Sequence, residues 1–235
     1  MLAVAGGKGG SGKTTTALGL ARALARRGME PLLVDCDPDM PDLHHYADLD
    51  RANGVDEVAA GNSPRAVSQT STTLPGVRLL TAGDRENVRA ALDRLQTWHD
   101  PVILDCPPGV GPDATRPLRA AAHTLVITTD EVQSLTDAAT TATCARELGA
   151  EPVGVVMRTT GSDAPVTWED EAPLLVNMQT AEKPLDSPAV AATWAKVSEK
   201  ILRAADLSRR KRSKSRQQRR SPERSPNCRS GKYCQ

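Results

Sequence analysis

Residues 2–15 of this chain read LAVAGGKGGSGKTT. The first four residues of this stretch are apolar and predict a buried strand, and the eight residues from Gly7 onward fit the pattern G-x-x-x-x-G-K-[ST] in full. A helix is predicted over 13–27, because apolar residues recur on one of its faces and Gly28 follows as a C-cap. A strand, a glycine loop and a helix in this order are typical of proteins that bind nucleotide phosphates.

The glycine loop has a specific physical use. Glycines let successive backbone N–H groups curl around phosphate oxygens, and the helix N-terminus adds the positive end of its dipole. Lys13 is expected to reach the β- and γ-phosphates, and the Thr14 hydroxyl is expected to ligate Mg²⁺. ATP and Mg²⁺ are therefore the predicted ligands. The loop residues expected to bind the nucleotide are Gly7, Gly9, Gly10, Ser11, Gly12, Lys13, Thr14 and Thr15.

Short apolar runs alternate with helical patterns along the rest of the chain, as in βαβ units. This alternation predicts an α/β fold with a doubly wound, mostly parallel sheet and helices on both faces. Further strands are expected at 31–34, 77–81, 102–104, 124–127 and 153–156. Further helices are expected at 55–60, at 84–96 with Asp84 as N-cap, at 134–148 and at 187–205.

The loop sequence Lys8-Gly9-Gly10-Ser11-Gly12-Lys13-Thr14 resembles the deviant Walker A motif, KGGxGKT, of the MinD/ParA family of P-loop ATPases, also called the SIMIBI class. In that family the lysine at the position of Lys8 reaches across a nucleotide-sandwich dimer to the phosphates of the partner. The resemblance therefore implies an ATP-dependent homodimer in which Lys8 and Lys13 both act on phosphates.

Two further stretches resemble the switch segments of the same family. The first, LVDCDPD at 33–39, implies that Asp37 positions or activates the attacking water and belongs to the Mg²⁺ shell. Asp35 is expected either to be structural or to support the metal ligands from behind. The second, VILDCPPG at 102–109, resembles Walker B and switch II. It implies that Asp105 holds Mg²⁺ through water and that the Gly109 N–H senses the γ-phosphate. A strand-end carboxylate that caps a loop is the alternative for either aspartate.

The resemblance covers roughly residues 1–205 and becomes weaker after 157. The family commonly has an asparagine after the sixth strand that reads adenine, and here the corresponding place holds Met157 and Arg158. Stacking of Arg158 on the base is the corresponding hypothesis.

Cysteines and histidines near the site suggest an alternative chemistry. Cys36 and Cys106 each follow an aspartate, so a redox or metal-linked thiol is one interpretation, and small packed side chains are the favoured one. Iron–sulfur relatives need a C-x-x-C pair, which this sequence lacks. His44 and His45 are interpreted as part of a solvated loop rather than as metal ligands.

Charge divides the chain at Leu207. Residues 208–235 hold eleven of the 30 Lys and Arg residues but only Glu223 of the 29 acidic ones, which leaves 19 basic and 28 acidic groups in residues 1–207. The acidic, lysine-poor body resembles proteins of salt-loving organisms such as halophilic archaea. The polar, basic segment 208–235 is predicted to be a disordered tail. The tail is either a DNA-binding arm or an appendage. The appendage is favoured because the tail lacks spaced aromatic residues and helical periodicity, and because phosphate contacts would contribute little in a high-salt cytoplasm.

The composition excludes several classes of protein. The 235 residues contain no 18-residue apolar run and no secretory signal, so a cytoplasmic protein is expected, and the C-terminal segment has no amphipathic membrane-targeting pattern. The expected function is a slowly hydrolysing Mg-ATP switch that dimerises to position a cargo in cell division or partitioning, with an activating partner protein. The alternatives are a metallochaperone or cofactor-insertion ATPase and a nucleotide-binding module without hydrolysis.

Overall fold

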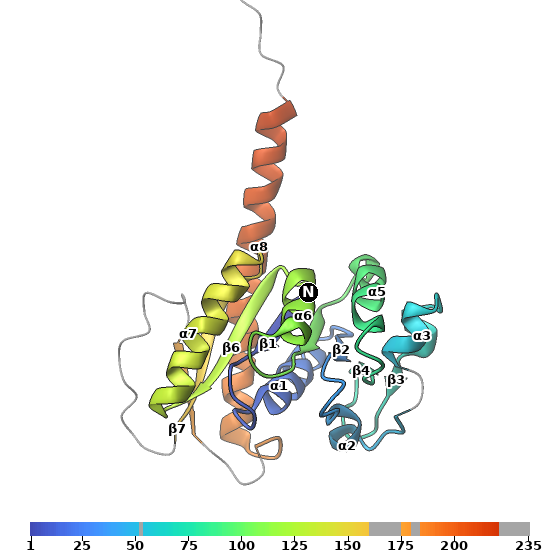
Figure 1. The fold of residues 1–235 in the computed structure, drawn as a ribbon, viewed down its shortest axis with the longest axis horizontal. Helices are drawn as coiled ribbons and strands as arrows, with labels where there is room; N and C mark the ends of the chain where they lie inside the picture. Colours follow the sequence, from blue (N-terminus) through green and yellow to red (C-terminus); the bar gives the residue numbers. More distant parts are fainter. Residues whose placement is uncertain (52–53, 160–174, 180–183, 221–235) are drawn as a thin grey trace, which may run out of the picture.

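The computed structural model describes residues 1–51, 54–159, 175–179 and 184–220. Its centre is an eight-stranded sheet with the order β3-β4-β2-β5-β1-β6-β7-β8 (Figure 1). All pairs are parallel except β3 with β4, which is antiparallel. The strands are β1 (Leu2–Ala5), β2 (Leu32–Asp35), β3 (Gln69–Thr70), β4 (Arg78–Leu80), β5 (Val102–Asp105), β6 (His123–Thr129), β7 (Glu151–Thr159) and β8 (Leu175–Gln179).

Helices cover both faces of this sheet, so the predicted fold class is confirmed. Side chains alternate along β1: Leu2 and Val4 pack with α1 and α8, whereas Ala3 and Ala5 face the core under α3, α5 and α6. Burial on both faces explains why the strands are continuously apolar. The helices are α1 (Lys13–Ala25), α2 (Leu43–Ala47), α3 (Val55–Ala59), α4 (Pro64–Val67), α5 (Asn87–Arg94), the 3₁₀ helix η1 (Leu95–Thr97), α6 (Pro112–Ala120), α7 (Val132–Glu147) and α8 (Pro188–Arg220).

The start of α5 differs from the sequence-based prediction. Asp84 was expected to cap this helix, but Glu86 occupies the N-cap position. The backbone N–H of Asp84 instead donates to Asp56 Oδ1 at 2.8 Å, and its carbonyl accepts the N–H of Asn87 at 2.9 Å. Asp84 therefore lies in the turn before the helix, because the Asp56 carboxylate of α3 holds it there.

Helix α8 also differs from the prediction, since it continues to Arg220 instead of ending near residue 205. Disorder was predicted from residue 208, and the helix runs through that boundary; residues 221–235 lie outside the described part. Figure 1 shows the C-terminal half of α8 extending beyond the sheet and its covering helices. Lys, Arg and Gln are good helix formers, and adding residues to an existing helix avoids the cost of nucleation. The change to a polar, basic composition after Leu207 therefore does not mark the C-terminal end of α8.

The N-terminal part of α8 is anchored on α1. Val190, Trp194 and Val197 are buried against the helix that follows the glycine loop. A Cβ at Gly19 would overlap the Trp194 ring, so the two helices approach closely only because residue 19 is glycine. No helix in the described ranges is long and apolar enough to cross a membrane.

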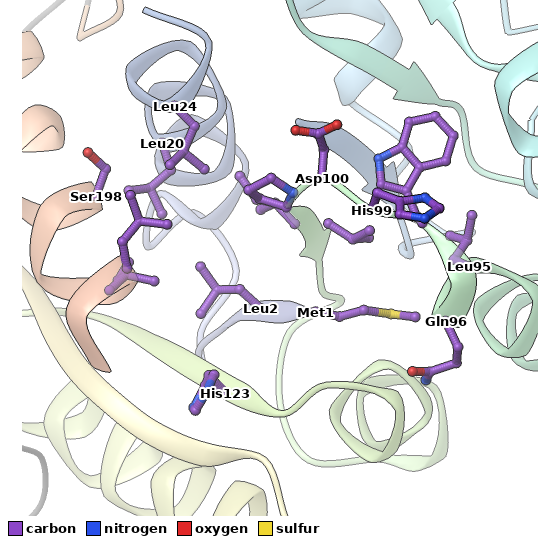
Figure 2. A pocket seen from close by; sticks show the side chains of 16 residues that line it. Met1, Leu2, Leu20, Leu24, Leu95, Gln96, His99, Asp100, His123 and Ser198 are labelled. Atoms are coloured by element: carbon purple, nitrogen blue, oxygen red, sulfur yellow. The ribbon is translucent and has the colours of Figure 1, made fainter. Parts of the chain in front are cut away.

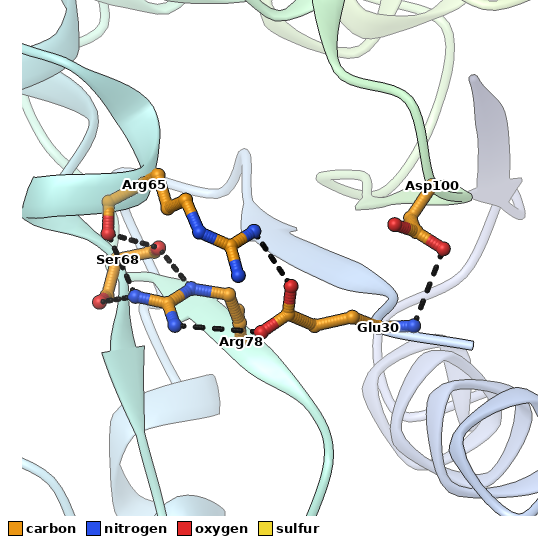
Figure 3. Close-up of polar contacts among 5 residues, drawn as sticks. All are labelled: Glu30, Arg65, Ser68, Arg78 and Asp100. Atoms are coloured by element: carbon orange, nitrogen blue, oxygen red, sulfur yellow. Dashed lines mark hydrogen bonds and ion pairs between the residues drawn. The ribbon is translucent and has the colours of Figure 1, made fainter. Parts of the chain in front are cut away.

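A polar network at the amino edge of the sheet fixes the β3–β4 hairpin (Figure 3). Glu30 pairs with Arg65 at 2.7 Å and with Arg78 at 3.6 Å, while its backbone N–H donates to Asp100 at 3.3 Å. Arg78 also donates to Ser68 Oγ at 2.7 Å. The network joins the segments that precede β2 and β5 to β4, and it lies at the end of the sheet away from the glycine loop.

Candidate nucleotide-binding site

The carboxyl ends of β1, β2 and β5 bring the predicted site residues together. Asp105 pairs in register with Val4 on one side and with Asp35 on the other. The glycine loop begins immediately after β1, so it lies next to both carboxylates. Ligands of doubly wound sheets bind at this edge.

Backbone shape at the loop requires glycine. Gly10 and Gly12 have φ values of +73° and +99°, in the left-handed region that other residues rarely adopt. A Cβ at Gly7 would overlap the Asp137 side chain of α7, so the loop fits closely against that helix. Gly12 is the N-cap of α1 and offers no side chain, which leaves the first N–H groups of the helix without a side-chain cap. Such a helix start binds anions.

Lys13 is the cation inside this cradle. Its side chain is largely buried, with only 8% of the residue exposed, and Nζ donates to the Lys8 carbonyl at 3.2 Å. Burial lowers the pKa of Lys13, and the nearby Asp105 carboxylate opposes that shift. An ammonium has three donors, so donors remain for phosphate oxygens.

Asp105 is the buried carboxylate of the site, with 3% of the residue exposed. Burial and the neighbouring Asp35 raise the pKa of Asp105 to about 8, against a hydrogen bond from Thr14 and the charge of Lys13. Among the described residues its Oδ1 has no hydrogen-bond partner, and neither has the buried Ser11 Oγ. Mg²⁺ prefers carboxylate, hydroxyl and water oxygens, so an orphaned carboxylate oxygen beside the Thr14 hydroxyl fits this ion.

Asp35 shapes the loop after β2. Its two carboxylate oxygens accept the backbone N–H groups of Asp37 at 3.1 Å and Leu43 at 3.4 Å. Burial raises the pKa of Asp35 to about 7. Asp37 is only half-buried and accepts the Met40 N–H at 3.1 Å. Asp35 therefore holds the loop, whereas Asp37 has access to solvent at the edge of the site.

Three other predicted residues already have partners inside the chain. The Gly109 N–H, with φ at +83°, donates to the Gly6 carbonyl at 3.1 Å. The Lys8 ammonium forms an ion pair with Glu131 at the start of α7. Arg158 Nη1 donates to the Gly10 carbonyl at 3.1 Å, so its guanidinium lies on the glycine loop.

Arg85 was not singled out from the sequence, and it connects the two switch segments. Its guanidinium pairs with Asp39 at 2.6 Å and with Asp113 at 2.9 Å. Asp39 lies two residues after Asp37, and Asp113 lies in the first turn of α6, just beyond Gly109. Exposed charged residues do not recur at the regular spacing of a buried helix or strand face. The sequence therefore contains no signal that Arg85 pairs with these two aspartates.

The two cysteines beside the site are packing residues. Cys36 and Cys106 are both about 1% exposed, and their backbone N–H groups donate to the backbone carbonyls of Asp105 and Val4 at 2.9 and 3.1 Å, respectively. Burial raises the pKa of both thiols, which suppresses the reactive thiolate form. In the described part of the chain no group of three or more His, Cys, Asp and Glu side chains is placed to hold a metal ion.

A cavity lies away from this site, at the amino edge of the sheet (Figure 2). Its volume is about 400 Å³, and Figure 2 shows Leu20 and Leu24 of α1 on one side of it and Leu95 and His99 on another. The lining is mostly apolar and includes no residue of the glycine loop. Cavity size therefore does not locate the phosphate site, which is an open cradle of backbone groups.

We expect Asp105→Asn to raise the thermal midpoint of the nucleotide-free protein at pH 8 by a few degrees. The folded-state pKa is raised to about 8, above the value of about 3.9 for an unfolded aspartate. Stability from this carboxyl is therefore present in acid and lost as the pH rises through 8. The advantage of the variant should shrink toward pH 5. Thermal unfolding without Mg²⁺ measures it, and an equal difference at both pH values would contradict the assignment.

A glycine cradle on a strand–loop–helix unit, with buried carboxylates on the neighbouring strand ends, defines a P-loop nucleotide-binding protein. The chain belongs to the CobQ/CobB/MinD/ParA nucleotide-binding domain family, whose model matches residues 2–213. The resemblance to MinD and ParA seen in the sequence is thereby confirmed.

Known proteins with similar sequences and structures agree with this family. An uncharacterized ATP-binding protein of Methanocaldococcus jannaschii is 29% identical over 212 residues, which cover 84% of this chain and 79% of that protein. The cell-division ATPase MinD of Pyrococcus furiosus superposes with a TM-score of 0.73 at 26% identity, covering 86% of this chain and 98% of that one. MinD of Pyrococcus horikoshii, solved with Mg-ADP, has a TM-score of 0.74 at 22% identity over 88% and 97% of the two chains.

Proposed function

We propose that this protein is a cytoplasmic ATPase that binds Mg-ATP, dimerises around it and hydrolyses it slowly. The dimer would position a cargo in cell division or in chromosome or plasmid partitioning, and a partner protein would stimulate hydrolysis. The observation that carries the proposal is the buried Asp105 oxygen without a partner, beside Lys13 and Thr14 at the uncapped start of α1. This set has the donors for phosphates and the oxygens for Mg²⁺ in one place.

In this mechanism the groups of a single chain bind and orient the nucleotide. The N–H groups of the loop and the Lys13 ammonium would hold the β- and γ-phosphates. The Thr14 hydroxyl and the Asp105 carboxylate would hold Mg²⁺. Bound Mg²⁺ would neutralise charge on the phosphate oxygens. Asp37 would orient the attacking water, because it reaches solvent from a loop that Asp35 holds in place.

The surface around the site has features that suit a second copy of the chain. Met40, Val110 and Val132 are exposed apolar side chains, with 81% of Val132 accessible. Met40 and Val110 lie on the loops that follow β2 and β5, and Val132 is the first residue of α7, which follows β6. All three are at the same edge of the sheet as the glycine loop. Apolar side chains gathered at one edge favour a protein–protein contact.

Lys8 is placed to act in such a dimer. Its ion pair with Glu131 joins two side chains that are 45% and 60% exposed. Exposed pairs of this kind contribute about 0–1 kcal/mol, so the pair can open at little cost. Once released, Lys8 would contact the phosphates bound to the partner.

The experiment measures mass and phosphate release together. With Mg-ATP or a non-hydrolysable analogue the protein should run as a dimer in size-exclusion chromatography with light scattering, and as a monomer with ADP. Phosphate should appear slowly with ATP. A monomer under every condition would contradict the switch. Dimerisation or binding without phosphate release would favour the alternative of a nucleotide-binding module that does not hydrolyse ATP.

The role of the basic segment is a separate part of the proposal. We keep residues 1–207 as the ATPase domain and the segment after it as an appendage, with DNA binding not favoured. The acidic excess of the body supports this choice, because a negative surface repels DNA phosphates.

A further inference from the structure

Arg158 lies at the carboxyl end of β7, where its side chain reaches across to the glycine loop. Its Nη1 donates to the Gly10 carbonyl at 3.1 Å, although 148 residues separate the two positions. Its Cδ and Nη1 lie 2.8 and 3.0 Å from the place that a Cβ of Gly12 would occupy. The guanidinium therefore covers the residue that begins α1, at the anion-binding end of the helix.

The charge of Arg158 is not neutralised within the described ranges, where it forms no ion pair with an acidic side chain. Arg85, which joins the two switch segments, differs in that respect, since it pairs with two aspartates. One backbone carbonyl uses one of the five N–H donors of an arginine. The remaining donors and the positive charge therefore lie beside Gly10 and Gly12 of the glycine loop.

We propose that Arg158 binds the phosphates of the nucleotide and does not read its base. The proposal rests on the nucleotide site proposed above and adds a third cation to Lys13 and Lys8. A guanidinium matches phosphate oxygens with paired N–H donors, and such charge-assisted bonds are strong. An arginine side chain cannot accept a hydrogen bond from the amino group of adenine. Arg158 therefore cannot recognise adenine through that group. Its contribution should be the same for any nucleoside polyphosphate.

The test compares ligands that share phosphates but differ in the base. Calorimetry would measure the binding of Mg-ADP, Mg-GDP and magnesium tripolyphosphate to the wild-type chain and to Arg158→Gln. We expect the variant to lose about tenfold or more in affinity for all three ligands, by a similar factor, as for a hydrogen bond to a charged group. Stacking on the base would instead weaken ADP binding and leave tripolyphosphate unchanged, and that result would overturn the proposal.

Two further variants separate phosphate binding from a structural tie. Arg22 also donates from Nη1 to a backbone carbonyl, that of Leu185 at 2.9 Å, but toward the far end of α1. Arg22→Gln should therefore leave all three affinities within twofold of wild type. Arg158→Lys keeps the charge and should recover part of the affinity. If Arg158→Gln bound the three ligands as tightly as Arg22→Gln does, Arg158 would have no role in phosphate binding. If the wild-type chain bound none of the ligands, the proposed function itself would be refuted.

Discussion

Lys13→Ala is expected to reduce nucleotide affinity by about 100-fold or more. Lys13 is the buried cation of the cradle, and each hydrogen bond from a charged donor to phosphate contributes about 1.5–3 kcal/mol. Its Nζ meets one internal acceptor, the Lys8 carbonyl, so the replacement removes phosphate contacts rather than a network of internal bonds. Calorimetric titration with Mg-ADP and Mg-ATP measures the loss.

The control for Lys13→Ala is an exposed lysine on another element. Lys196 lies on the solvent side of α8, and Lys196→Ala should bind nucleotide as the wild type does. Circular dichroism should show that Lys13→Ala keeps its helices, because the loop conformation is fixed by Gly10 and Gly12. Wild-type affinity in a folded Lys13→Ala protein would refute the phosphate site.

Asp37→Ala and Lys8→Ala should have opposite effects on assembly. Without the Asp37 carboxylate the attacking water lacks its orienting group, so ATP should persist and hold the dimer. Without Lys8 the partner's phosphates lose a cation, so both the dimer and ATP hydrolysis should be lost while a single chain still binds nucleotide. Size-exclusion chromatography with Mg-ATP, together with phosphate release, distinguishes these outcomes. An Asp37→Ala protein that stays monomeric would count against the sandwich dimer.

Each of these variants has a matched partner. Asp37→Asn removes the charge but keeps an oxygen that can accept the Met40 N–H. If the negative charge of Asp37 is what orients the water, this variant should trap the dimer as Asp37→Ala does. Glu131→Gln breaks the same ion pair as Lys8→Ala but leaves the lysine in place. It should therefore dimerise with ATP, and a loss equal to that of Lys8→Ala would assign the effect to the ion pair.

Local sequence patterns predicted the strand–loop–helix unit because its determinants are local. The strand Leu2–Ala5 has the predicted bounds, and α1 begins at the predicted Lys13, since glycines and an apolar run decide both. Helix α6 was not predicted, because its nine residues begin with a proline and contain Pro117, which normally interrupts a helix. Its proline at the first position fits a helix start, but the pattern was too short to stand out from a loop.

The contacts that arrange the site could not be derived from the sequence. Lys8 and Glu131 are separated by 123 residues, and Arg85 and Asp39 by 46. Pairing of exposed charges depends on how the loops of different strands meet at one sheet edge, and a single sequence has no periodic signal for that. Residues 160–174, whose sequence includes Pro165 and Pro173, lie outside the described ranges.

The hydrogen bond from the Gly109 N–H to the Gly6 carbonyl would set a threshold for the proposed switch. One N–H serves one strong acceptor at a time, so a third phosphate can recruit Gly109 only by displacing an acceptor that the protein already supplies. ADP has no third phosphate and would leave that internal bond intact. The protein would then distinguish ATP from ADP by a competition for the Gly109 N–H between the Gly6 carbonyl and the third phosphate. The bond to Gly6 is the state that forms without any ligand.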